Sequence, residues 1–164
     1  MAWIYTTNQK NTARFTLGEE GERILACVGV NPSNASPEKL DRTMQSVKRI
    51  ANYNGYDGWL MLNLYPQRAT NPQNIHKRMN KQLYTDNLLQ IEEALNTYAI
   101  SNIWLAYGDL VETRNFLIKA KLELLSLLQS KDLTVYQLGS LTKKGNPRHP
   151  LYQRWDSKLS IHLP

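Results

Sequence analysis

Four short apolar runs constrain the fold of this chain more than any other feature. They cover residues 24–30, 59–65, 103–107 and 133–138, and each is continuously apolar rather than alternating with polar residues. Continuous runs of this length are typical of strands that are covered on both faces of a sheet. The sequence therefore predicts at least four buried strands.

Segments with helical spacing lie between these runs. Apolar residues recur at three- and four-residue steps in each: Met44, Val47, Ile50 and Ala51, then Leu88, Ile91, Leu95 and Tyr98, then Leu117, Ala120, Leu124, Leu127 and Leu128. Alternating strands and helices predict a three-layer α/β fold, with a mainly parallel central sheet and helices on both faces. Upstream, residues 3–5 and 14–17 are expected to add a short antiparallel edge.

The length and the residue types limit what the chain can hold. Its 164 residues predict a single α/β domain spanning 1–164. The only cysteine, Cys27, lies inside the first apolar run, so we expect a buried structural thiol and no disulfide framework. No histidine pair or carboxylate cluster has metal-ligand spacing, and neither GxxxxGK[ST] nor GxGxxG occurs. We therefore expect no metal and no cofactor.

The charge and the N-terminal sequence predict the compartment and the class of partner. The first residues lack the pattern of a signal peptide and the apolar runs are too short to cross a bilayer, so we expect a cytoplasmic protein without a membrane partner. Twenty Lys and Arg residues against fourteen Asp and Glu give a net charge of +6. This balance favours polyanions such as nucleic acid.

Polar residues and turn formers gather in the loops after the predicted strands, at residues 29–34, 63–68, 107–109 and 139–150. Ligands of open parallel sheets bind at this edge. Asn63 interrupts an apolar run, and its amide would cost a few kcal/mol if unpaired, so it needs a backbone or a ligand partner. His149 follows Arg148 in a basic loop and is the most suggestive of the histidines.

The chain resembles an uncharacterised bacterial and phage family, the domain of unknown function family numbered 1643. The resemblance rests on short segments in order along the chain, notably Val30-Asn-Pro-Ser-Asn-Ala-Ser36, Asp41-Arg-Thr43, Asn63-Leu-Tyr65 with Arg68-Ala-Thr70, and Gly145-Asn-Pro-Arg-His-Pro-Leu-Tyr152. This family implies no established activity.

The same loops are more distantly similar to motifs of the uracil-DNA glycosylase superfamily. The similar segments are Val28-Gly-Val-Asn-Pro32, Leu60-Met-Leu-Asn63, Ile103-Trp-Leu-Ala-Tyr-Gly108 and His149-Pro150. The resemblance implies a uracil-DNA-glycosylase-like fold, in which Asn31 holds the attacking water and His149 stabilises charge on the departing base. It further implies that Asn63, with Ser33 and Tyr107, contacts the base.

Residues near the C-terminus complete what this resemblance implies for a nucleic-acid partner. Leu151 or Tyr152 would wedge into the duplex, while Lys143, Lys144 and Arg148 would contact phosphates. The chain also departs from the superfamily pattern. Ser33 replaces a glycine that lets the backbone approach the nucleotide, and Leu151-Tyr152 replaces the usual Ser-Pro.

Three functions remain open on the sequence. The first is hydrolysis of an N-glycosidic bond in nucleic acid, DNA rather than RNA, without a metal. The second is an enzyme that acts on a free nucleoside, a nucleotide or another nucleobase-containing small molecule. The third is a non-enzymatic module that binds nucleic acid or protein and has an inactive pocket. Salt-dependent DNA binding separates the first from the second.

Overall fold

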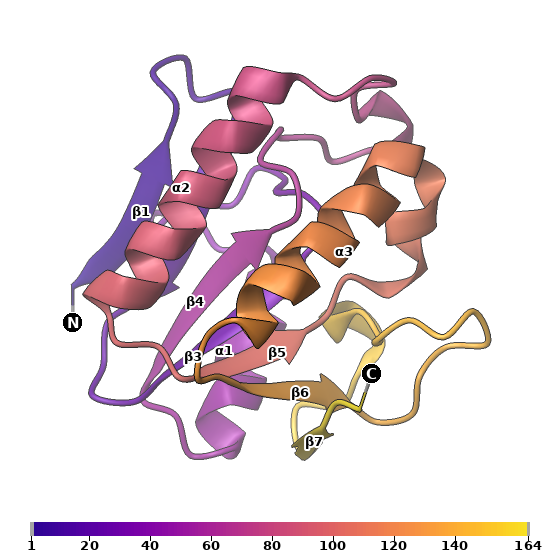
Figure 1. The fold of residues 1–164 in the computed structure, drawn as a ribbon. Helices are drawn as coiled ribbons and strands as arrows, with labels where there is room; N and C mark the ends of the chain where they lie inside the picture. The colour runs from indigo at the N-terminus through magenta and orange to yellow at the C-terminus, as the bar shows by residue number, and fades with distance from the viewer. Residues whose placement is uncertain (1, 164) are drawn as a thin grey trace.

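A computed structural model describes residues 2–163 and contains one seven-stranded sheet, in the order β1-β2-β4-β3-β5-β6-β7 (Figure 1). The predicted α/β class is confirmed. Its centre is the parallel set β4-β3-β5-β6, formed by β3 (Ile24–Gly29), β4 (Gly58–Asn63), β5 (Asn102–Leu105) and β6 (Thr134–Leu138). All four predicted strands are therefore present. Several end one or two residues early, because the chain turns there into the loops of the site.

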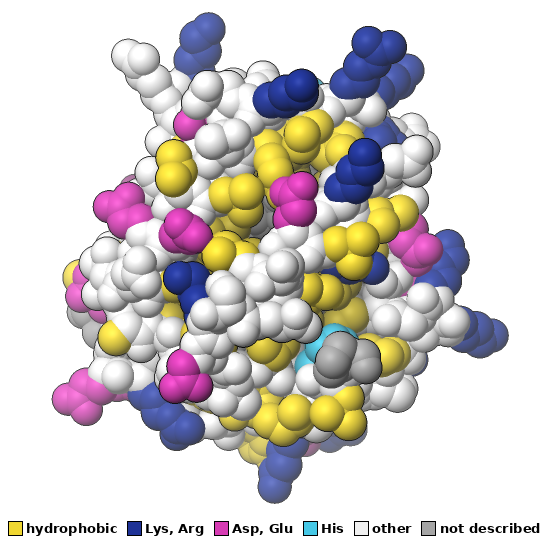
Figure 2. Space-filling view, in the orientation of Figure 1, with side chains coloured by type: hydrophobic (Ala, Val, Ile, Leu, Met, Phe, Trp, Pro, Cys, Tyr) yellow, Lys and Arg dark blue, Asp and Glu magenta, His cyan; other side chains and the backbone are white. Residues whose placement is uncertain are grey.

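Three helices cover the two faces of this sheet. α1 (Arg42–Tyr53) lies behind the sheet in Figure 1, and α2 (Lys81–Thr97) and α3 (Asn115–Gln129) lie in front. The apolar stripes predicted from the sequence face the sheet, with Met44, Val47 and Ile50 buried under α1. Apolar side chains also lie between the two front helices, and Lys and Arg side chains project around the margin of that face (Figure 2).

The outer strands correct the expectation of a mainly parallel sheet. β1 (Trp3–Thr7) pairs antiparallel with β2 (Arg14–Glu19), β2 pairs antiparallel with β4, and β6 pairs antiparallel with β7 (Leu159–Ile161). The sheet is mixed, because both ends of the chain return alongside the parallel core without a helical crossover. The antiparallel edge expected at residues 3–5 and 14–17 is present, whereas β7 was not predicted.

Two apolar cores lie on the two sides of the sheet. The α1 side holds Leu25, Cys27, Met61 and Trp104, and the α2 and α3 side holds a larger set around Ile91 and Leu105. Cys27 is fully buried, as expected, and burial raises the pKa of its thiol. No helix among residues 2–163 has the length and apolar character needed to cross a membrane.

Candidate functional site

A cavity of about 790 Å³ opens beyond the carboxyl ends of β3, β4 and β5. The chain leaves β3 through α1 toward β4 and leaves β5 through α3 toward β6, in opposite directions along the sheet, which creates a topological switch point there. The volume suits a small organic ligand. Residues from several segments line it: 14, 29–33, 41, 43, 44, 61, 63, 69, 70, 72, 107–110, 113, 142, 148, 149 and 151–153.

Asn63 ends β4 at this cavity, and its side-chain amide is unpaired. The residue is 1% exposed, and neither Nδ2 nor Oδ1 has a hydrogen-bond partner within residues 2–163. Asn63 pairs with Gly29 of β3. A Cβ atom added to Gly29 would lie only 3.0 Å from the Asn63 Oδ1. The sequence left a backbone or a ligand as the partner of this amide. The structure provides no backbone partner.

Two methionines line the cavity beside its most buried polar groups. Met61 precedes Asn63 by two residues, on the same face of β4, and its Cε lies near the point above Gly29 that Oδ1 also approaches. Met44, in the first turn of α1, also lines the cavity. Unbranched thioether side chains repack readily. The side chains beside the Asn63 amide are therefore flexible ones.

Asn31 follows β3 and has a fixed amide. Nδ2 donates to the carbonyl oxygens of Pro32 at 3.0 Å, Gln67 at 3.3 Å and Ala69 at 2.9 Å. These bonds join the loop after β3 to the loop after β4 and set the orientation of the planar amide. Among the described residues, nothing donates to Oδ1. Asn31 thus presents a positioned acceptor in the cavity wall and also has a structural role, because its bonds to Gln67 and Ala69 join two loops.

His149 lies immediately before the short helix η3 (Pro150–Tyr152), with one nitrogen engaged and the other free. Nδ1 accepts from the backbone N–H of Leu151 at 3.2 Å, so the proton of the neutral ring is on Nε2. Burial lowers the pKa of His149, against a smaller opposing effect of Asp41. The ring is therefore a neutral N–H donor. Its Nε2 has no hydrogen-bond partner in the described part of the chain.

The loop after β5 holds His149 in place. Gly108 opens the short helix η2 (Gly108–Thr113), has φ of +58°, and donates its N–H to the Pro147 carbonyl at 2.8 Å. A Cβ at this position would lie 3.3 Å from the His149 Cβ. Farther along, Asn146 donates from Nδ2 to Asp109 at 2.9 Å and to Glu112 at 2.8 Å. Close approach and these bonds fix the loop that carries the histidine.

Ser33 and Tyr107 both line the cavity, and their hydroxyl groups differ in hydrogen bonding. The Ser33 hydroxyl donates to Asp41 Oδ2 at 2.8 Å, so it is already engaged. Asp41 uses its other oxygen to cap α1, accepting from the Met44 N–H at 2.9 Å. Burial raises the pKa of Tyr107 to about 12, so its phenol stays protonated. Of these two predicted base contacts, only Tyr107 has a hydroxyl without a hydrogen-bond partner among residues 2–163.

The predicted nucleic-acid contacts divide into two groups. Arg148, Leu151 and Tyr152 line the cavity, and Tyr152 is 85% exposed at its rim. Arg148 donates from Nε to the Ser140 carbonyl at 2.8 Å, which ties it to its own loop. Lys143 and Lys144 are exposed and lie outside the cavity lining. The structure thus gathers every predicted site residue except these two lysines around one cavity.

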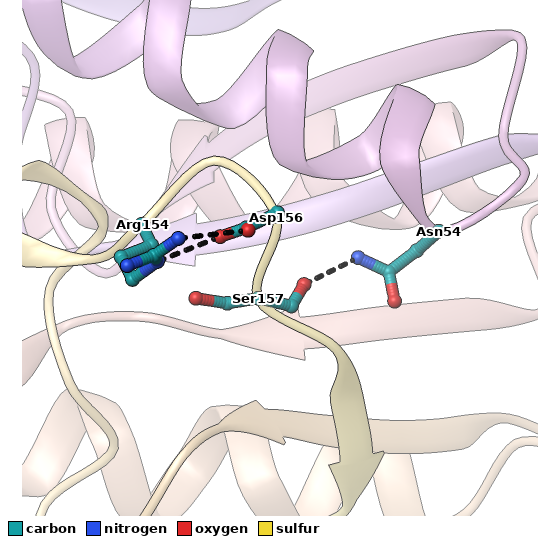
Figure 3. Close-up of polar contacts among 4 residues, drawn as sticks. All are labelled: Asn54, Arg154, Asp156 and Ser157. Atoms are coloured by element: carbon teal, nitrogen blue, oxygen red, sulfur yellow. Dashed lines mark hydrogen bonds and ion pairs between the residues drawn. The ribbon is translucent and has the colours of Figure 1, made fainter.

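The segment after η3 is anchored to the end of α1. Asn54 donates from Nδ2 to the Ser157 carbonyl at 2.9 Å (Figure 3). Its Oδ1 accepts from the Leu159 N–H at 3.0 Å. Arg154 pairs with Asp156 at 2.9 Å (Figure 3). The charge of Arg154 is therefore neutralised locally. The anchor holds the segment that follows the exposed Tyr152.

Sequence reasoning missed three polar residues near the cavity. Arg14 is a fully buried cavity residue, Asp41 joins the α1 cap to Ser33, and Arg68 donates to the Ser33 carbonyl at 2.6 Å. Asp41 and Arg68 belong to segments that carried the family resemblance, which was a usable signal. No cluster of three or more His, Cys, Asp or Glu side chains suited to a metal ion occurs within residues 2–163.

A family described as protein of unknown function (DUF1643) matches residues 14–151. The match covers most of the chain, and the chain belongs to this family. No curated protein and no solved structure matches the chain.

Proposed function

We propose that this member of the family binds a nucleobase in the cavity and hydrolyses the N-glycosidic bond that joins the base to its sugar. The unpaired, buried amide of Asn63 carries the proposal. An amide offers one acceptor oxygen and two donor hydrogens, which complements the alternating donors and acceptors on the edge of a base. A bound base would pair the two Asn63 atoms that the protein itself leaves unpaired.

The proposed chemistry needs a positioned water and a donor at the base. Cleavage builds positive charge on the sugar and negative charge on the departing base. Three bonds that Nδ2 of Asn31 donates orient the amide, and Oδ1 can accept from the attacking water. The neutral His149 ring keeps an Nε2–H donor for a base carbonyl. Water adds to the sugar carbon as the C–N bond breaks, and its proton balances the charge of the departing base.

The proposed substrate is a base turned out of DNA. Leu151 and Tyr152 are apolar, lie at the cavity rim and are 38% and 85% exposed. Such side chains can fill the space that a flipped base leaves in the stack. Lys143 and Lys144 are exposed in the adjacent loop and have no carboxylate in ion-pair distance within residues 2–163, so they suit phosphate contacts.

A free nucleoside or nucleotide is the second candidate, favoured by one observation. The cavity lining includes neither Lys143 nor Lys144, so a small ligand can occupy it without touching the basic loop. Binding of such a small ligand should not depend on salt concentration, whereas binding of DNA should. Binding of a base without its release would instead favour a non-enzymatic module, for which the engaged hydroxyl of Ser33 is the structural argument.

Release of free base is the decisive assay. The parent protein is incubated with oligonucleotides that carry uracil, mismatched thymine or damaged bases, and with nucleosides, and free base is detected by mass. His149→Ala should reduce the rate about 10²–10³-fold, by comparison with the loss of one oxyanion donor. His162→Ala is the matched control, because burial also lowers the pKa of His162, which lies outside the cavity. Equal losses in both variants, or no release from any substrate, would reject the reaction.

A further inference from the structure

Arg14 is a buried guanidinium with too few acceptors. It is 1% exposed, yet its side chain makes only two hydrogen bonds within residues 2–163: Nη1 donates to the Ala35 carbonyl at 3.2 Å, and Nη2 donates to Met44 Sδ at 4.0 Å. Nε has no partner. A guanidinium has five N–H donors. Most of these donors are therefore unused in the interior of the protein.

The charge of Arg14 is also only partly compensated, because Asp41 acts on it from beyond ion-pair distance. No carboxylate forms an ion pair with it in the described chain, and both oxygens of Asp41 are engaged with Ser33 and with the α1 N-terminus. Arg68 places a second guanidinium nearby, since its Nη1 donates to the same Ala35 carbonyl at 3.2 Å. Burial and then Arg68 lower the pKa of Arg14 to about 10, against smaller opposing effects of Asp41 and Tyr5. The region has an excess of positive charge that an anion would balance.

Arg14 lies at an irregularity of the sheet. The β1–β2 register shifts between Thr6 and Thr7, where Thr7 pairs with Arg14. Such bulges change the direction of side chains and often occur next to sites. Arg14 lines the same cavity as Asn63. Its neighbour Met44 also lines it, and a thioether is a weak acceptor on a mobile side chain.

We infer that Arg14 binds a phosphate group of the ligand, with a phosphate oxygen replacing the Met44 thioether at the guanidinium. Guanidinium groups match phosphate with paired N–H donors. The first turn of α1, including Thr43 and Met44, borders the cavity and adds the positive end of its dipole. The inference rests on the proposed function for the base: Asn63 binds the base and Arg14 the phosphate, so the ligand is a nucleoside phosphate.

Binding measurements on matched ligands test the subsite. By calorimetry, the parent is titrated with a nucleoside, its 5′- and 3′-monophosphates, a short single-stranded oligonucleotide and inorganic phosphate. We expect the phosphate to strengthen nucleoside binding at least tenfold, and inorganic phosphate to compete with the nucleotide. Comparison of the monophosphates with the oligonucleotide identifies the source of the phosphate. An equal affinity for the nucleoside and for all of its phosphates would overturn the inference.

Two variants assign the effect to Arg14. Arg14→Met should remove the gain from phosphate and keep nucleoside binding, whereas Arg49→Met, which removes an exposed cation of α1, should keep both. Arg14→Lys keeps the positive charge but loses the paired N–H donors of the guanidinium, so it should keep part of the affinity gained from phosphate. If Arg14→Met does not fold, the titration of Arg14→Lys decides. A full gain in affinity from phosphate in Arg14→Lys would reject recognition by the paired guanidinium donors.

The two proposals fail separately. Binding of inorganic phosphate that depends on Arg14, without binding of any nucleoside, would retain the subsite and reject the base pocket. Binding of nucleosides without a contribution from phosphate would retain the base pocket and reject the subsite.

Discussion

Replacement of Asn63 by Leu should make the ligand-free protein more stable and abolish base binding. The side chain is buried, and both of its polar atoms lack partners within residues 2–163. Each such atom costs about 1–3 kcal/mol, while the added methyl volume beside Gly29 costs part of that gain through overpacking. The flexible Met61 side chain can absorb some of the added volume. We expect a net stabilisation of about 1–3 kcal/mol.

The assay is thermal and denaturant unfolding of the two variants Asn63→Leu and Asn87→Leu. For a chain of this size, about 1 kcal/mol shifts Tm by about 2–4 °C, so Asn63→Leu should raise Tm by several degrees. Asn87 is equally buried, but its Nδ2 donates to the carbonyls of Asn63 at 2.8 Å and Leu64 at 3.4 Å. Asn87→Leu should therefore destabilise the protein by about 1–2 kcal/mol.

The test is that the two substitutions should change the free energy of unfolding in opposite directions. A loss of stability above about 1 kcal/mol in both Asn63→Leu and the smaller Asn63→Ala would mean that the Asn63 amide is hydrogen-bonded in solution, for example to ordered water. The amide would then be structural. A stabilised variant that still binds nucleosides with parental affinity would equally refute its role in base recognition.

Other expectations follow from single contacts. Gly29→Ala should weaken nucleoside binding, measured by calorimetry, because the new Cβ would lie 2.6 Å from Met61 Cε and 3.0 Å from Asn63 Oδ1. Burial lowers the pKa of His149 below the ordinary 6.5, so the unfolded state binds more protons and stability should fall as pH falls through about 6.5. His149→Gln should flatten that part of the pH–stability curve. Replacing both Lys143 and Lys144 by Ala should reduce the salt slope of DNA binding by about two.

The sequence predicted the parallel core because its physical signal is local. A strand covered on both faces must be apolar along its whole length, and runs such as 24–30 have that character. The stripe of Met44, Val47 and Ile50 likewise reports which face of α1 is buried. β7 could not be predicted in this way. Its three residues are mostly exposed, and its pairing with β6 depends on the anchor that Asn54 provides.

Polar residues of the site were predictable only in part. Asn63 was identifiable because an amide in an apolar run needs a hydrogen-bond partner. Whether the backbone supplies that partner depends on the tertiary structure and could not be predicted. Asn87 carried a similar signal, since it lies three residues after the buried Tyr84 and four before Ile91, on the apolar stripe of α2. Arg14 had no such signal. It begins a strand at the point where the β1–β2 register shifts, and this irregularity depends on the pairing of two strands.

The unpaired polar groups of the protein are concentrated at one place. Of the five buried side-chain atoms without partners in residues 2–163, three belong to Asn63 and Arg14, which line the same cavity. A fourth is Oδ1 of Asn87, whose Nδ2 holds the Asn63 carbonyl from the other side of the sheet. Native proteins keep such groups rare, and each costs stability. A cationic ligand would repel Arg14 and an apolar ligand would leave all three cavity atoms unpaired. A ligand with a donor–acceptor edge and an anionic group would satisfy them together, which is the argument for a nucleoside phosphate.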